Sequence, residues 1–152
     1  MGVNIKYYDE EYPLGTAGSL KAVKDFITET TVVCYSGDLK RLDMDDMYVF
    51  HKNNNKSCTI ALTTVDDPSK FGVALMNGNK IITFIEKPSK ERAPSKLINS
   101  GVFIVEPEIL KYIPDGFAKN DNLIGYVFSG QWMKIKTHED IEHARKDWKG
   151  IK

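Results

Sequence analysis

The stretch TVVCYSGDL, residues 31–39, decides how the rest of the chain is interpreted. An apolar, β-branched run ends abruptly at Gly37-Asp38, which predicts a buried strand over 31–36 and then a loop that carries one carboxylate. In parallel α/β sheets, ligands bind beyond the carboxyl ends of strands, so Asp38 is well placed to hold a metal ion or a polar substrate. The simpler alternative is an Asp that only caps a turn, and this stretch alone favours that alternative.

Composition narrows the classes of partner and compartment. Lys and Arg total 21, Asp and Glu also total 21, and the basic residues are dispersed, which argues against nucleic acid as a partner. No apolar run reaches the roughly 18 residues of a membrane span. The length of 152 residues suits a single domain. Cys34 and Cys58 lie in strand-like apolar runs, which predicts buried, reduced thiols and a cytoplasmic location.

The first third of the chain predicts a strand and two helices in addition to the strand and loop of residues 31–39. Residues 3–8 alternate well enough for a short strand, and apolar spacing predicts a helix over 19–27. Asp43 is the expected N-cap of the next helix, and His51 near its end is interpreted as a cation that favours the helix dipole. The residues expected to point inward from that helix are Met44, Met47, Tyr48 and Phe50.

The remainder predicts strands, one hairpin and a capped terminal helix. Asn77-Gly78 between two apolar runs is a strong hairpin signal, and Thr137 with Asp140 forms a capping-box pattern. The expected elements are strands at 58–65, 72–76, 80–85, 97–105 and 126–135, a short helix from Pro107 to Ile113, and a last helix striped by Ile141, Ala144 and Trp148. Alternating strands and helices with one hairpin indicate an α/β sandwich of the doubly wound type, with a mixed, mostly parallel sheet.

Two further segments have residue types suited to binding. Gly15, Thr16 and Gly18 stand before a helix N-terminus, where backbone amides can approach a nucleobase or an anion. Glu86 and Lys87 follow the end of a predicted strand, where a lysine can serve as a point charge for a phosphate. Taken singly, the first segment is better explained by a plain strand-to-helix turn and the second by an ordinary surface lysine.

The order of the segments is more specific than any one of them. Along the chain they read LGTAG, a strand ending in GD, His51, DPSKFGV, FIEKP, LINSGVF and finally QW followed by T-x-E-D. This series covers almost the whole chain and resembles the sugar-1-phosphate nucleotidyltransferases, in particular the mannose-1-phosphate guanylyltransferase group. The resemblance implies a three-layer, Rossmann-like nucleotide-diphospho-sugar transferase sandwich. It also implies a reaction of the GTP and mannose type, in which a nucleoside triphosphate and a sugar 1-phosphate give a nucleotide sugar and pyrophosphate.

The resemblance also assigns roles to residues. Asp38 and Lys87 are the implied catalytic residues, with Asp38 as ligand of Mg²⁺ and Lys87 on the sugar phosphate. The nucleotide-binding residues are implied to be Gly15, Thr16 and Gly18. The sugar-binding residues are implied to be Gly72, Glu86, Lys87 and Asn99, with Gly101 in the strand behind Asn99.

The sequence departs from the family pattern in three places. A G-x-G-x-R-x-x-P loop for the triphosphate is not among these residues, so the resemblance implies a partial domain, 1–152, truncated at its N-terminus. In the family's W-x-D-I-G-T pattern Lys134 replaces the second metal-binding aspartate, and 115–122 is too short for a further helix. The alternative function is therefore a non-catalytic regulatory subunit that binds nucleotide sugars, or an inactive fragment. The lost central strand predicts a homo-oligomer or a complementing chain.

Overall fold

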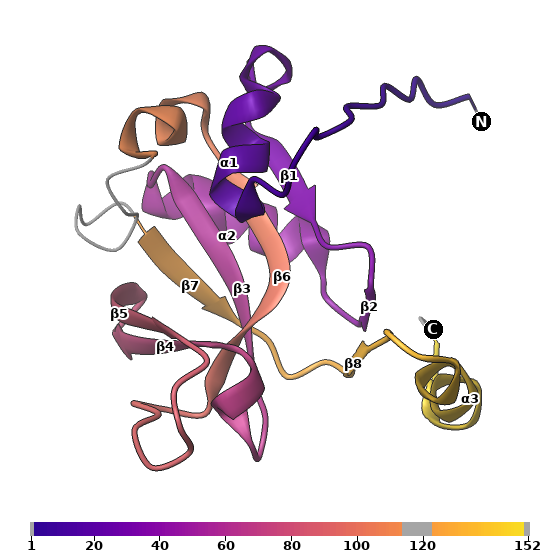
Figure 1. The fold of residues 1–152 in the computed structure, drawn as a ribbon. Coiled ribbons are helices and arrows are strands. Elements are labelled where there is room, and N and C mark those ends of the chain that lie inside the picture. The colour runs from indigo at the N-terminus through magenta and orange to yellow at the C-terminus, as the bar shows by residue number, and fades with distance from the viewer. Residues whose placement is uncertain (1, 114–122, 151–152) are drawn as a thin grey trace.

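The chain folds as one six-stranded sheet with helices on both faces and a small two-stranded ribbon at one end (Figure 1). The computed structural model describes residues 2–113 and 123–150. Its helices are α1 (Gly15–Ala22), α2 (Met44–Asn54) and α3 (His138–Asp147), with 3₁₀ segments η1 (Lys24–Phe26), η2 (Pro68–Lys70) and η3 (Pro107–Tyr112). Its strands are β1 (Thr31–Cys34), β2 (Asp38–Lys40), β3 (Cys58–Thr64), β4 (Gly72–Asn77), β5 (Lys80–Glu86), β6 (Leu97–Val105), β7 (Leu123–Val127) and β8 (Trp132–Lys134).

The main sheet has the order β1-β6-β3-β7-β5-β4, and β4 also pairs with β6. β1, β3, β7 and β4 run in one direction and β6 and β5 in the other, so the expected mixed sheet with mostly parallel strand directions is confirmed. Because the two reversed strands lie between the others, only β3 and β7 pair as parallel neighbours among the described strands. The ribbon is the antiparallel pair β2 and β8.

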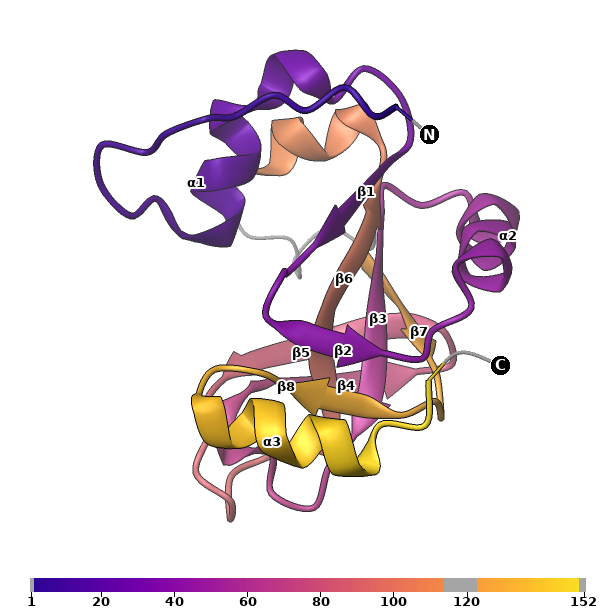
Figure 2. The ribbon, with the colours of Figure 1, turned by 90° about the vertical axis from the view of Figure 1, so that its right-hand side faces the viewer.

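Two apolar clusters hold the three layers together. On one face, α1, η1 and η3 pack on the sheet through residues such as Leu20, Ile27 and Ile109. On the other face, Met47 of α2 is fully buried against Ala61 of the central strand β3. Figure 2 shows α1 and α2 on opposite sides of the sheet, with the ribbon and α3 crossing its lower end. The burial of β3 on both faces, predicted from its continuous apolar run, is confirmed.

Several expected elements are confirmed with small changes of boundary. The Asp43 side chain caps α2 by accepting from the Asp46 N–H, and Thr137 with Asp140 forms the capping box of α3. The hairpin turns at Gly78, which has φ +57°, a conformation that glycine adopts without strain. The predicted strand 97–105 has the observed bounds, whereas the segment after Pro107 is a 3₁₀ helix, and 114–122 lies outside the described residues.

Other expectations were wrong, for identifiable reasons. Residues 3–8 form no strand, and Val3 and Ile5 are 79% and 62% exposed, because no described strand lies beside them to pair with. β1 is a half-exposed edge strand rather than a buried one, so Val32 and Cys34 are exposed and only Cys58 is a buried thiol. Tyr48 of α2 points outward and is 44% exposed.

The expected strand 126–135 is two strands, and the expected helix 19–27 is shifted. Gly130 separates β7 from β8, and a Cβ there would overlap the carbonyl oxygen of Arg41. Helix α1 begins earlier, at Gly15, and its last turn continues as η1. The poor helix propensity of Gly15 and Gly18 suggested a loop, but packing of Leu20 and Val23 on the sheet overrides that local preference.

Candidate active site

Asp38 lies just beyond the carboxyl end of β1, where the sequence placed it, but it opens the short strand β2 instead of standing in a loop. Its side chain is only 8% exposed. It lies beside Gly101 of β6, because a Cβ at Gly101 would be 3.1 Å from Asp38 Oδ2. Gly101 has φ +77°, so both its backbone and its neighbours require a glycine at this position. The carboxylate is therefore held against the main sheet rather than free in a turn.

Asp38, Lys40, Trp132 and Lys134 lie on one side of the ribbon, and we call this set the Asp38 face. Asp38 is directly opposite Lys134 in the β2–β8 ladder, and Lys40 is opposite Trp132. Trp132 Nε1 donates to the Ser100 carbonyl at 3.3 Å, so the Asp38 face looks toward the main sheet. Lys40 Nζ lies 3.7 Å from Asp38 Oδ2, and Lys134 Nζ lies 5.0 Å from the centre of the Phe71 ring.

These residues fit a divalent metal poorly. Mg²⁺ in proteins is held by one or two carboxylates together with phosphate groups of the substrate. Asp38 is the one acidic member of its face, and the ammonium of Lys40 already compensates its charge. Within the described part of the chain no cluster of three His, Cys, Asp or Glu side chains could hold a metal ion. Two lysines beside one carboxylate favour an anion over a cation.

A cavity of about 360 Å³ lies between α1 and the sheet, and its lining residue Tyr35 lies against Gly101, as Asp38 does. It brings together three of the residues singled out in the sequence, namely Thr16, Glu86 and Asn99. The rest of its wall is mostly apolar or aromatic: Ala17, Leu20, Val33, Tyr35, Cys58, Ile60, Phe84, Phe103, Val105 and Leu123. A largely apolar pocket with a few convergent polar groups is typical of a small-molecule site.

The glycines and the hydroxyl of the LGTAG segment lie in the first turns of α1, at the rim of this cavity. Gly15 has φ +69°, and Ser19 Oγ donates to its carbonyl at 2.8 Å. A Cβ at Gly18 would come within 2.8 Å of the Leu14 side chain. Thr16 Oγ1 and the Tyr35 hydroxyl share a hydrogen bond of 2.7 Å, which connects α1 to the end of β1.

On the opposite rim, Gly72 and Glu86 face each other across the β4–β5 ladder. A Cβ at Gly72 would be 2.5 Å from the Phe84 ring and 2.9 Å from Glu86 Oε2, so glycine leaves room for that carboxylate. Lys87 has φ +46°, its N–H donates to the Phe71 carbonyl, and its ammonium lies 3.8 Å from Glu86. Because both side chains are about two-thirds exposed, that ion pair contributes little to stability and leaves Lys87 free to meet a ligand.

Asn99 connects the cavity to Asp38. Its side-chain oxygen accepts the Gly101 N–H at 2.8 Å, and its amide nitrogen has no protein acceptor among the described residues. Because Gly101 also lies against Asp38, Asn99 and Asp38 flank the same glycine of β6. Lys87 and Gly72, in contrast, are not part of the cavity wall and lie beyond Glu86.

Tyr35 and Cys58 are cavity residues whose place in the site the sequence motifs did not indicate. The Tyr35 ring lies 5.7 Å from the Phe103 ring, centre to centre, with the planes tilted by 58°, and its hydroxyl reaches Thr16. Its only signal in the sequence is an aromatic residue just before Ser-Gly-Asp. Cys58 lines the cavity floor, and burial raises the pKa of its thiol to about 12. It is therefore a neutral apolar surface at physiological pH and not a nucleophile.

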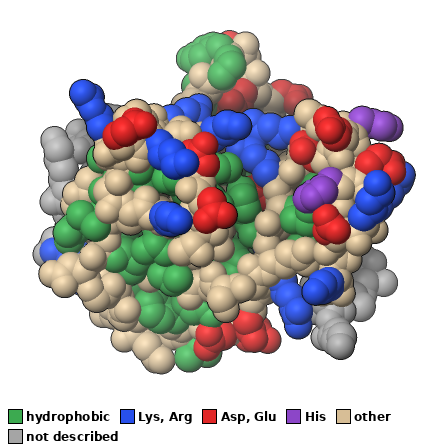
Figure 3. All heavy atoms as spheres, turned by 90° about the horizontal axis from the view of Figure 1, so that it is seen from below, with side chains coloured by type: hydrophobic (Ala, Val, Ile, Leu, Met, Phe, Trp, Pro, Cys, Tyr) green, Lys and Arg blue, Asp and Glu red, His purple; other side chains and the backbone are tan. Residues whose placement is uncertain are grey.

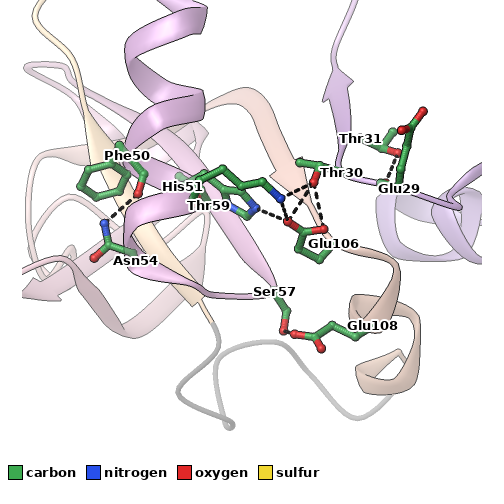
Figure 4. A network of polar contacts seen from close by, with 11 residues as sticks. Glu29, Thr30, Thr31, Phe50, His51, Asn54, Ser57, Thr59, Glu106 and Glu108 are labelled. Atoms are coloured by element: carbon green, nitrogen blue, oxygen red, sulfur yellow. Dashed lines mark hydrogen bonds and ion pairs between the residues drawn. The ribbon is translucent and has the colours of Figure 1, made fainter.

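A second polar cluster lies at the other end of the sheet (Figure 4), and we call it the His51 cluster. Its members are His51, Lys52, Thr30, Thr59 and Glu106. His51 is 1% exposed, with Nδ1 2.7 Å from Thr59 Oγ1 and Nε2 3.2 Å from Glu106 Oε1. Lys52 Nζ and Thr30 Oγ1 also donate to that carboxylate.

The protonation of the His51 cluster differs from the sequence expectation. Burial lowers the pKa of His51, an effect that hydrogen bonding to Glu106 only partly offsets, so the neutral imidazole is favoured over a cation at the helix end. Burial would raise the pKa of Glu106, but hydrogen bonds from Lys52, Thr30 and His51 outweigh it and the net pKa is lowered. Neutral His51 then donates from Nε2 to the carboxylate and accepts the Thr59 hydroxyl at Nδ1.

The face of the molecule seen from below agrees with the charge balance of the sequence. On the face seen in Figure 3, basic and acidic side chains are interspersed, and hydrophobic side chains gather in a separate part. No extended basic stripe of the kind that binds nucleic acid is seen on that face. No helix in the described ranges combines the length and the apolar character needed to cross a bilayer.

Comparison with known proteins assigns the class. Residues 1–149 match the family described as Nucleotidyl transferase, and the chain belongs to that family. It is 30% identical to a mannose-1-phosphate guanylyltransferase of Mycobacterium tuberculosis over 97% of this chain, and 33% identical to mannose-1-phosphate guanyltransferase beta-B of Xenopus laevis over 93%. The chain covers 45% and 43% of these two proteins, so it spans less than half of their length.

A solved structure supports the fold. The crystal structure of a UDP-glucose pyrophosphorylase complexed with UDP-glucose aligns with a TM-score of 0.80 and 20% identity. The alignment covers 94% of this chain and 65% of that one. The resemblance predicted from the order of motifs, and the fold class that it implied, are therefore confirmed.

Proposed function

We propose that this chain carries the sugar-side half of the active site of a sugar-1-phosphate nucleotidyltransferase that uses GTP and mannose 1-phosphate. The observation that carries the proposal is the cavity, which gathers Thr16, Glu86 and Asn99 from α1, β5 and β6 beside Asp38. In the reaction, a phosphate oxygen of the sugar 1-phosphate forms a bond to the α-phosphorus of the triphosphate. The bond from that phosphorus to the departing pyrophosphate breaks. Positioning and neutralisation of charge provide most of the catalysis in such a transfer.

The residue roles are part of this proposal. The rim of α1, with Gly15, Thr16 and Gly18, is assigned to the base of the nucleotide. The opposite rim, with Gly72, Glu86 and Asn99, is assigned to the sugar hydroxyls, because a carboxylate and a free amide nitrogen are suited to accept from and donate to them. The exposed ammonium of Lys87 is assigned to the sugar phosphate.

Asp38 is assigned to the reacting phosphates, with a restricted role in metal binding. Because Lys40 and Lys134 share its face, we propose that Asp38 does not hold Mg²⁺ without help from ligand phosphates. The same arrangement supports a second candidate function, a non-catalytic subunit that binds nucleotide sugars. A cytoplasmic location is also proposed, on the basis of the free Cys34 and Cys58.

We further propose that the sheet is completed by additional polypeptide, either a second copy or a complementing chain. The outer edge of β1 has no partner among the described strands, and the extended residues 2–12 expose Ile5, Tyr7 and Tyr12. An unpaired edge next to apolar segments favours pairing with another strand. Light scattering at micromolar concentration would show a species larger than the monomer, whereas a stable, well-folded monomer would contradict this part.

Calorimetry tests the central proposal. GTP, GDP-mannose and mannose 1-phosphate are titrated into the chain with and without Mg²⁺, and pyrophosphate release is followed in parallel. Turnover that disappears in Asp38→Ala supports the enzyme, and binding without turnover supports the regulatory subunit. Glu86→Gln and Asn99→Ala should each weaken binding of mannose 1-phosphate, while Lys111→Met, on the exposed surface of η3, serves as control. Absence of binding to all three compounds would refute both functions.

A further inference from the structure

The Asp38 face has more positive than negative charge. Its charged members are one carboxylate, Asp38, and two ammonium groups, Lys40 and Lys134. Asp38 and Lys40 form an ion pair with both side chains less than 10% exposed, so these two charges compensate each other. Within the described residues no carboxylate lies within ion-pair distance of Lys134, which is instead placed over the Phe71 ring. Lys134 therefore brings an uncompensated positive charge to the site.

Lys134 lies beside the segment that carries Gly72, one of the residues assigned to the sugar. Phe71, over which its ammonium lies, immediately precedes Gly72 and accepts the N–H of Lys87 through its carbonyl. Across the ribbon, Asp38 adjoins Gly101 and thereby Asn99. The backbone of Lys134 thus pairs with that of Asp38, the carboxylate assigned to the reacting phosphates, while its ammonium lies over the residue that precedes Gly72. A compact, strongly hydrated point charge at such a place is suited to a phosphate group.

We propose that Lys134 binds the phosphate groups of a nucleotide sugar directly and so makes binding independent of divalent metal. This inference rests on the proposed function and names the charge that holds the ligand. Lys134 takes the part that a metal ion would otherwise take, while Lys40 keeps the nearby carboxylate from repelling the phosphates. Charge-assisted contacts of this kind are about twice as strong as neutral hydrogen bonds.

The test compares binding with and without metal in matched variants. GDP-mannose is titrated by calorimetry into the wild-type chain in EDTA and in millimolar Mg²⁺, and the two affinities should agree within a few-fold. Lys134→Met should weaken binding in EDTA by about tenfold or more, since one charge-assisted contact is lost. Guanosine, which has no phosphate, should bind both proteins equally. Lys111→Met removes the same charge at the other end of the molecule and should leave both affinities unchanged.

Two more variants keep the test decisive. Lys134→Gln retains a polar side chain if Lys134→Met does not fold, and it should show the same loss. Lys134→Asp should abolish binding in EDTA and recover it in Mg²⁺. Wild-type binding that requires Mg²⁺, or metal-free binding that survives Lys134→Met and Lys134→Gln, would overturn the inference while leaving the proposed function intact. Absence of any GDP-mannose binding would refute the proposed function and the inference together.

Discussion

The His51 cluster and the Asp38 face are both polar groups held at the ends of one sheet, yet they differ in how their charges are matched. In the His51 cluster every buried polar group has a partner, and Glu106 accepts from three side chains. On the Asp38 face Lys134 lies over an aromatic ring and has no carboxylate within ion-pair distance among the described residues. Matched polar groups specify the fold, whereas an unmatched charge beside a cavity is available to a ligand. The comparison predicts that substitutions at the two ends will affect different properties.

The largest expected effect is on stability at the His51 end. His51→Ala removes a buried ring and leaves Thr59 and Glu106 without its hydrogen bonds, so the free energy of unfolding should fall by about 3 kcal/mol. Urea denaturation measures this loss, and ligand affinity should be unchanged. His51→Gln, which can keep one hydrogen bond, should lower the free energy of unfolding by less than His51→Ala does. Equal loss in both variants would mean that the cavity, and not the hydrogen bonds, dominates.

At the other end, Gly101→Ala should affect stability and binding together. The positive φ costs an alanine about 1–2 kcal/mol, and its Cβ would be 2.6 Å from the Tyr35 ring and 3.1 Å from Asp38. We expect the free energy of unfolding to fall by about 2 kcal/mol or more in total, and GDP-mannose to bind more weakly. Gly78→Ala is the control, because Gly78 has a positive φ but open space around a Cβ. It should lower the free energy of unfolding only by the cost of placing alanine at a positive φ. Unchanged ligand affinity in Gly101→Ala would separate Asp38 from the site.

A smaller effect is expected when the connection between α1 and β1 is cut. Tyr35→Phe keeps the ring on Phe103 but loses the hydrogen bond to Thr16, and nucleotide affinity should fall about three- to tenfold. Affinity for mannose 1-phosphate should not change, because the opposite rim is untouched. Tyr48→Phe, on exposed α2 surface, is the matched control. Equal weakening of both ligands would indicate a general structural role for Tyr35.

The smallest expected effect is the response of stability to mild acid. Because the folded pKa of His51 is lowered, the unfolded chain binds more protons once the pH falls below the ordinary value of 6.5, and stability declines from there. The lowered pKa of Glu106 extends the decline below its ordinary value of 4.5. Denaturation midpoints measured from neutral to acidic pH should fall less steeply in His51→Gln. An identical profile in that variant would exclude His51 as the source of the first decline.

How much the sequence predicted depends on whether local or distant residues decide a feature. The hairpin at Asn77-Gly78 and the caps of α2 and α3 depend on a few adjacent residues, and they were predicted correctly. The exposure of Cys34 was not predicted, because it depends on whether a strand lies beside the outer edge of β1. The network of His51 depends on Glu106, far along the chain, and periodicity within one helix carries no sign of it.

The candidate site shows the same division. The ordered motifs identified Thr16, Glu86 and Asn99, and the structure brings these three to one cavity. The part played by Tyr35 could not be predicted, because it rests on a hydrogen bond between the end of one strand and the start of a preceding helix. Lys134 was recognised as a departure from the family pattern, but its position over Phe71 required the packing of the ribbon on the main sheet.

The ribbon that carries Asp38 and Lys134 also sets the order in which the protein can assemble. β2 and β8 are three-residue strands from distant parts of the chain, so their pairing closes a long loop in exchange for few contacts. We expect such a pairing to form late in folding and to open early under stress. Amide hydrogens of Leu39 and Met133 should therefore exchange faster than those of β3, and a bound nucleotide sugar should slow them most.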